Sequence, residues 1–137
     1  MSMKRLSILI KNLISNLFIM KDILEIHILE PVDSYQVVEF VGEFDKFGLS
    51  SVKPKLESFL KTFSLDVLVL DFTGLKFINS EGIGLLFEIH THLAKANKKL
   101  AVVGSAAHVK DVFETVGMSE VIPMYGKLAD FVKSNNA

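Results

Sequence analysis

Cysteine is absent from this chain of 137 residues, and only three prolines are present. Without cysteine the chain has neither a disulfide framework nor a cysteine-ligated metal site, and it fits a reducing compartment. The low proline content and a hydrophobic share of 50% argue against extensive disorder. We therefore expect one ordered domain with a sizeable core, since domains commonly run to about 100–150 residues.

The chain also lacks a large net charge: positive and negative residues nearly balance, and the net charge is -1. The charges are nevertheless unevenly spread. Residues 1–19 contain Lys4, Arg5 and Lys11 and no acidic residue, a charge of +3, which leaves residues 20–137 at -4. An acidic body argues against nucleic acid as the main partner.

The first nineteen residues have an amphipathic pattern of their own. Large apolar residues recur at helical spacing, namely Leu6, Leu9, Ile10, Leu13, Ile14 and Leu17. The pattern is too short to span a bilayer and lacks the apolar core and cleavage site of a signal peptide, so we expect a cytoplasmic protein. Three interpretations stay open: a helix that packs on the domain or on the mate in a homodimer, an anchor at a membrane surface, and translation that begins at Met20.

Strands and helices alternate along the rest of the chain. The expected strands cover 23–29, 35–41, 67–72, 100–103 and 121–124, and the expected helices cover 49–63, 80–96, 106–116 and 128–133. The first two strands predict a hairpin, and the alternation is typical of an α/β fold with a mostly parallel sheet. Pro54 is expected in the first turn or two of its helix, and Gly117 as a left-handed cap.

The most informative segment is the turn that follows the apolar strand at 67–72. Asn79 and Ser80 are good helix-capping residues, and the carboxylate of Glu81 complements the positive end of a helix dipole. Gly82 and Gly84 remove side chains from the first turn, so that another molecule has access to the backbone. The sequence therefore predicts that the Ser80 hydroxyl is presented where a phosphate group is well tolerated.

These residues resemble the signature of the STAS domain (sulphate transporter and anti-sigma-factor antagonist), most closely that of the bacterial anti-sigma-factor antagonists. Three landmarks carry the resemblance: Gly42-Glu43-Phe44-Asp45, Ile78-Asn79-Ser80-Glu81-Gly82-Ile83-Gly84 and Thr115-Val116-Gly117-Met118. We expect an amphipathic extension at 1–19 and a single STAS-like α/β domain at 20–137. The domain should have a mostly parallel central sheet, an N-terminal β-hairpin and about four helices packed on the sheet.

The resemblance implies an anti-sigma-factor antagonist, which is not an enzyme and uses no cofactor. In the implied cycle the unphosphorylated protein binds an anti-sigma factor, itself a serine kinase, and thereby releases a sigma factor. The kinase phosphorylates Ser80 and ends binding, and a metal-dependent serine phosphatase restores it. The positions expected to contact the partner are Asp45, Asn79, Ser80, Glu81, Gly82, Gly84 and Leu85.

Two residues depart from the family pattern and keep a second function open. Asn79 stands where the family usually has an acid, and Glu81 replaces a small hydroxyl residue. STAS domains also serve as accessory subunits of ABC-type membrane transport complexes, where phosphorylation is not needed. The departures and the amphipathic extension both favour that alternative.

Enzymatic and metal chemistry find little support in the sequence. The chain has no phosphate-loop spacing and no Gly-x-Ser-x-Gly elbow around Ser80. None of the four histidines has a companion at metal-binding spacing. Asp71 is expected to brace a turn at the end of its strand, and for Asp45 both helix capping and partner contact stay open.

Overall fold

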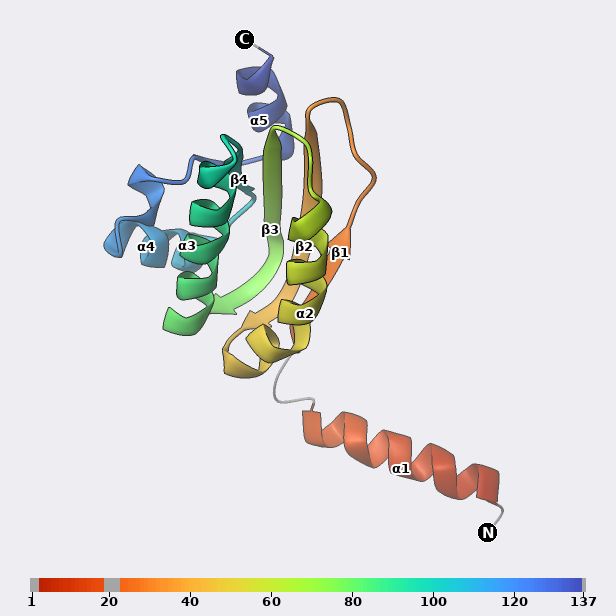
Figure 1. Cartoon of the computed structure of the whole chain (residues 1–137). Coiled ribbons are helices and arrows are strands. Elements are labelled where there is room, and N and C mark those ends of the chain that lie inside the picture. The colour runs from red at the N-terminus through yellow and green to blue at the C-terminus, as the bar shows by residue number, and fades with distance from the viewer. Residues whose placement is uncertain (1–2, 19–22, 137) are drawn as a thin grey trace.

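The computed structural model describes residues 3–18 and 23–136. The elements in chain order are α1 (Met3–Phe18), β1 (Glu25–Ile28), β2 (Tyr35–Phe44), α2 (Lys46–Thr62), β3 (Val67–Ile78), α3 (Ser80–Lys95), β4 (Lys99–Val103), α4 (Ala107–Thr115), a 3-10 helix (Met118–Glu120), β5 (Met124–Tyr125) and α5 (Leu128–Asn135). The five strands form one sheet in the order β1-β2-β3-β4-β5 (Figure 1). Only the pairing of β1 with β2 is antiparallel, which confirms the predicted hairpin and mostly parallel sheet.

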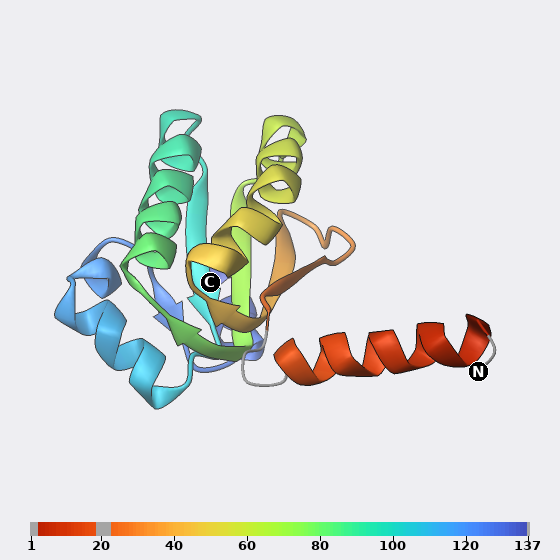
Figure 2. The same ribbon diagram turned by 90° about the horizontal axis from the view of Figure 1, so that it is seen from below.

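The sheet separates two hydrophobic clusters, because alternate residues of a strand point to opposite faces. Leu68 and Leu70 of β3 join the larger cluster, to which α2, α3 and α4 contribute. Val67 and Val69 join the smaller cluster, which is closed by Phe131 of α5. Three helices therefore cover one face and α5 covers the other, and α2 and α3 lie side by side in both views (Figures 1 and 2).

Helix α2 differs from the prediction in where it begins. It starts at Lys46 and not at 49, because the side chain of Asp45 caps it. Pro54 is therefore the ninth residue of the helix, and the expectation that it lies in the first turn or two is wrong. An interior proline removes the helical N–H donor for the carbonyl of Ser50, and both residues lie on the exposed side of the helix.

Strand β3 is twice as long as expected, and this moves Asp71 from a strand end to the middle of a strand. The strand continues to Ile78 because β2 pairs with it as far as Phe44, with register shifts along the way. Thr73 and Gly74 resemble a turn in the sequence, yet Gly74 pairs with Val41 of β2. The left-handed cap predicted at Gly117 is confirmed by its φ of 75°.

Helix α1 confirms that the N-terminal segment is helical. Figures 1 and 2 both show it beside the layers of the domain and not within them. Its described side chains, at positions 3–11 and 13, are exposed. Within residues 3–18 and 23–136, no helix combines the length and apolar character needed to cross a membrane. The predicted boundary between residues 19 and 20 lies outside the described part of the chain.

Candidate functional site

The candidate site is built where β2 and β3 end next to each other. Phe44 and Ile78 form the last register pair of these two parallel strands. One residue further on, the backbone N–H of Asn79 donates to the carbonyl of Phe44 at 3.0 Å. Because α2 starts after Asp45 and α3 starts at Ser80, this bond joins the beginnings of both helices at one edge of the sheet.

Asn79 caps α3, as predicted. Its side-chain Oδ1 accepts from the backbone N–H groups of Glu81 and Gly82, both at 3.1 Å. Ser80 is the first residue inside the helix, and its side chain is exposed. The cap is thus made by the asparagine, while the serine hydroxyl stands at the surface of the positive end of the helix dipole.

Asp45 caps α2 and is itself buried. Its side chain is 8% exposed, and Oδ1 accepts from the N–H of Gly48 at 2.9 Å. Of the two roles left open by the sequence, helix capping is confirmed, and contact with a partner stays a prediction. A side chain so deeply buried can act on a partner mainly by fixing the loop around it.

Replacement of Asp45 should therefore lower the free energy of unfolding. Asp45→Ala is expected to lower the free energy of unfolding by about 1–2 kcal/mol, because the first turn of α2 loses its acceptor. Asp45→Asn keeps an acceptor oxygen and should recover most of that loss. Urea unfolding of the two variants measures the difference, and equal losses would show that the cap bond contributes nothing.

The two glycines of α3 serve different purposes. Gly82 is buried, and a Cβ there would come within 2.8 Å of Ile78 Cγ1 and of Phe44 Cδ1. Its missing side chain is therefore needed by the interior packing, not by access from outside. A Cβ on Gly84 would meet nothing within 4 Å, so Gly84 has the open backbone that the sequence reasoning assigned to both glycines.

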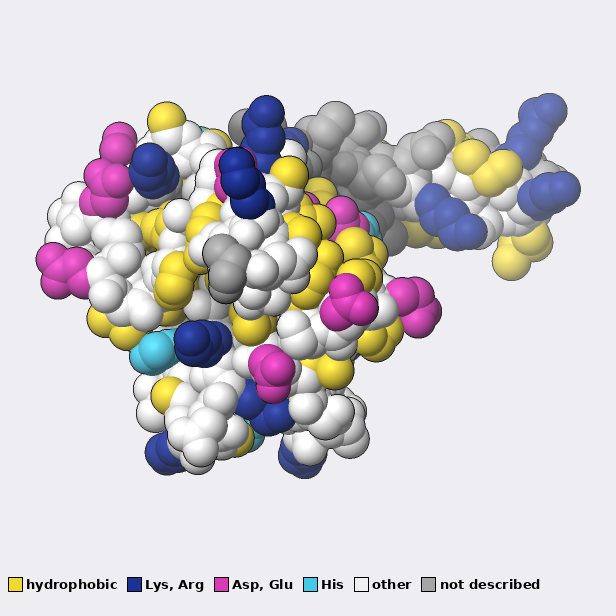
Figure 3. Space-filling view, turned by 90° about the horizontal axis from the view of Figure 1, so that it is seen from above, with side chains coloured by type: hydrophobic (Ala, Val, Ile, Leu, Met, Phe, Trp, Pro, Cys, Tyr) yellow, Lys and Arg dark blue, Asp and Glu magenta, His cyan; other side chains and the backbone are white. Residues whose placement is uncertain are grey.

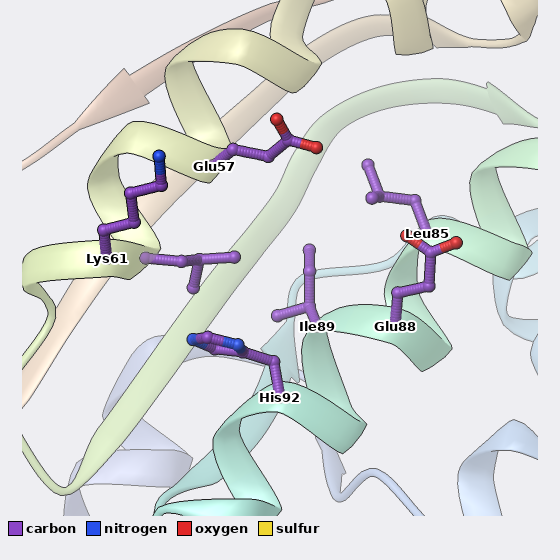
Figure 4. Close-up of a pocket in the computed structure, with 7 residues that line it drawn as sticks. Glu57, Lys61, Leu85, Glu88, Ile89 and His92 are labelled. Carbon is purple, nitrogen blue, oxygen red and sulfur yellow. The ribbon is translucent and has the colours of Figure 1, made fainter.

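A groove between α2 and α3 lies beyond the helix starts (Figure 4). Its cavity is about 320 Å³, and it is lined by Glu57, Leu60, Lys61, Leu85, Glu88, Ile89 and His92. Leu85 is only 7% exposed, so it forms part of the floor of the groove and not a projecting contact. The sequence reasoning missed the groove because it arises from the pairing of two helices that are far apart in the chain.

Two exposed aromatic side chains flank the site and were also missed. Phe47, two residues after Asp45, is 66% exposed, and Phe77, two residues before Asn79, is 45% exposed. Exposed large apolar side chains can form part of a contact surface where they lie together, whereas single ones are common on protein surfaces. For Phe77 the available sequence signal was its place next to Ile78 in an apolar strand, because adjacent residues of a strand point to opposite faces.

The remaining sequence-predicted residues have structural explanations. Asp71 Oδ1 accepts from the backbone N–H of Thr73 at 2.9 Å and from its hydroxyl at 2.6 Å, so Asp71 braces the backbone as expected, although within β3. Glu81 is exposed in the first turn of α3. Within residues 3–18 and 23–136, no three histidine or acidic side chains are grouped so as to hold a metal ion.

Comparison with known proteins gives the same architecture. The family model described as the STAS domain matches residues 26–131. The crystal structure of an anti-sigma factor antagonist from Mycobacterium paratuberculosis superposes with a TM-score of 0.73 at 21% identity, covering 83% of this chain and 95% of that one. An anti-sigma-factor antagonist (STAS) domain protein from Planctomyces limnophilus gives a TM-score of 0.71 at 14% identity, covering 80% and 95%.

A third solved structure is the Bacillus cell fate determinant SpoIIAA in its phosphorylated form. It superposes with a TM-score of 0.63 at 15% identity, covering 80% of this chain and 98% of that one. At such identities the three superpositions establish the fold, and the family model establishes the relationship. The chain belongs to the STAS domain family.

Proposed function

We propose that this protein is an anti-sigma-factor antagonist whose unphosphorylated form binds an anti-sigma factor and whose binding ends when Ser80 is phosphorylated. The observation that carries the proposal is the exposed position of Ser80 as the first residue of α3, next to the start of α2. The similarity to solved anti-sigma factor antagonists supports it. In this role the chain is a binder and a kinase substrate, not a catalyst.

The local chemistry supports a switch that acts on binding and not on folding. A phosphate group adds about -1.5 to -2 charges near neutral pH, and the N–H groups at a helix start favour a negative group. Asn79 already supplies the cap, so modification of Ser80 removes no hydrogen bond that holds α3. The added charge and bulk would stand at the exposed start of α3, next to the start of α2, where the proposed partner would dock.

The two departures from the family pattern, Asn79 and Glu81, affect how a kinase could phosphorylate Ser80. The side-chain oxygen of Asn79 is engaged with the backbone of α3, and an amide cannot serve as a general base. The base that removes the Ser80 proton therefore has to come from the kinase. Glu81 is exposed beside Ser80, and its negative charge should slow the approach of a phosphate donor.

The test is the intact mass of the protein from its native cells, with peptide mapping, beside Ser80→Ala. We expect a phosphate adduct that maps to Ser80 and disappears in Ser80→Ala. Ser51→Ala, which removes another exposed serine from the second turn of α2, is the matched control and should keep the adduct. Absence of the adduct under all growth conditions, and with candidate anti-sigma kinases and ATP, would overturn the phosphorylation switch.

The second candidate function is a STAS accessory subunit that docks on an ABC-type membrane transport complex without phosphorylation. The exposed apolar and basic side chains of α1 favour it, as does the amide at position 79. Copurification separates the two functions. A transport ATPase or permease recovered equally with wild type and Ser80→Ala would favour the accessory subunit, and a serine kinase recovered only with unphosphorylated protein would favour the antagonist.

A further inference from the structure

Helix α1 exposes a stripe of large apolar side chains. Met3, Leu6, Leu9, Ile10 and Leu13 are between 44% and 82% exposed. Residues three and four apart lie on one side of a helix, so these five side chains share one face. Soluble proteins seldom leave such a continuous stripe in water unless another surface covers it.

The charges on the same helix are all positive. Lys4 and Lys11 lie two turns apart on the side opposite the apolar stripe, and Arg5 lies at its flank. The 16 residues of α1 include no acidic residue. Figure 3 shows this combination directly, with dark blue and yellow side chains and no magenta ones on the coloured part of α1.

The geometry points to a surface that is both apolar and anionic. We propose that α1 lies in the plane of a membrane surface rich in anionic phospholipid, with its apolar stripe at the acyl boundary and its basic side chains among the headgroups. Amphipathic helices with basic polar faces bind such interfaces through buried apolar area and electrostatic attraction together. At 1.5 Å per residue the helix is about 24 Å long, which suits an in-plane orientation.

Charge also argues against a second copy of α1 as the covering surface. A second copy packed along the stripe would cover the apolar side chains, but the positive charges of Lys4 and Lys11, on the opposite side of the helix, would lie outside that contact. An anionic bilayer would bury the apolar stripe and would also attract the positive charges of α1. On the polar face, Lys4 and Lys11 keep their ammonium groups in water near the anionic headgroups, and Arg5 lies at the flank of the stripe.

Vesicle binding by the full chain tests the proposal. The protein is mixed with vesicles of phosphatidylcholine, with or without phosphatidylglycerol, and the bound fraction is measured by sedimentation. We expect binding to the vesicles that contain phosphatidylglycerol, little binding to phosphatidylcholine alone, and weaker binding in high salt. Equal binding to both vesicle types, or binding to neither, would overturn the proposal.

Substitutions within α1 test which of its side chains contact the membrane. Leu9→Gln should weaken partitioning by about tenfold, because one large apolar side chain is lost from the stripe. Ile8→Gln makes a similar change on the opposite side and is the matched control, with an expected effect below about threefold. Lys4→Gln together with Lys11→Gln should reduce binding by about 25-fold, at roughly fivefold per basic residue.

Self-association of the protein through α1 would give a different result in sedimentation velocity. Sedimentation velocity of the wild type without lipid should show one species whose size does not depend on protein concentration. An oligomer that Leu9→Gln dissociates and Ile8→Gln preserves would overturn the membrane proposal in favour of self-association. Because glutamine is nearly as good a helix former as leucine, circular dichroism should show the same helix content in all variants.

Discussion

Phe72→Ala is expected to lower the free energy of unfolding by about 3–5 kcal/mol. The Phe72 ring is fully buried in the larger cluster. It packs edge-on against Phe40 of β2, with ring centroids 5.3 Å apart, and against Phe113 of α4 at 5.8 Å. Its removal would leave a cavity between the central strands and the helix layer, and the rings around it would lose their contacts together.

Phe77→Ala is the matched control, because it makes the same change in the same strand. The Phe77 side chain is 45% exposed, so we expect a loss of about 1 kcal/mol or less. Urea unfolding of both variants, with m-values compared, measures the difference. Losses of equal size would contradict the placement of Phe72 in the core and Phe77 at the surface. If Phe77 contacts a partner, its substitution should weaken partner binding while stability is nearly preserved.

Gly82→Ala should destabilise the protein, whereas Gly84→Ala should stabilise it. A methyl group at position 82 would have to displace Phe44 or Ile78, which approach the Cβ position to 2.8 Å. Overpacking of a well-filled interior costs about 1–3 kcal/mol, and the better helix propensity of alanine offsets only part of it. At position 84 the propensity gain of about 0.5–1 kcal/mol should remain, because the methyl group meets nothing within 4 Å.

Thermal melting of the two glycine variants gives opposite shifts if this assignment holds. A shift of the same sign at both positions would contradict it. The same two variants also distinguish an effect on folding stability from an effect on partner binding. If α3 contacts a partner through its open backbone, Gly84→Ala should raise the melting temperature and still weaken binding, while Gly82→Ala should affect binding only through the loss of folded protein.

The order of the strands and helices was predictable because their signals are local. The apolar run at Val67–Leu70, the cap at Asn79 and the left-handed Gly117 each follow from residues close together in the chain. The length of β3 was not predictable, since Thr73 and Gly74 favour a turn unless β2 is already alongside. Pairing between strands that are distant in sequence outweighed the local preference.

The candidate site likewise has some features that local sequence predicts and others that depend on tertiary packing. The exposed serine at a helix start was predicted from the residues around it, and the structure places Ser80 there. The burial of Asp45, the packing of Gly82 against Phe44 and the groove along Leu85 all depend on tertiary packing between separate elements. No spacing within a single segment contains that information.

The short outer strands of the sheet determine how this molecule can be recognised. β1 has four residues and carries Glu25 and His27 on exposed positions, and β5 has only two residues. A long and flat edge would invite another chain to add a strand, and short or charged edges discourage both that mode of binding and aggregation. Partners are therefore left with the side chains and the helix ends, and the phosphate proposed at Ser80 would act at one of these helix ends.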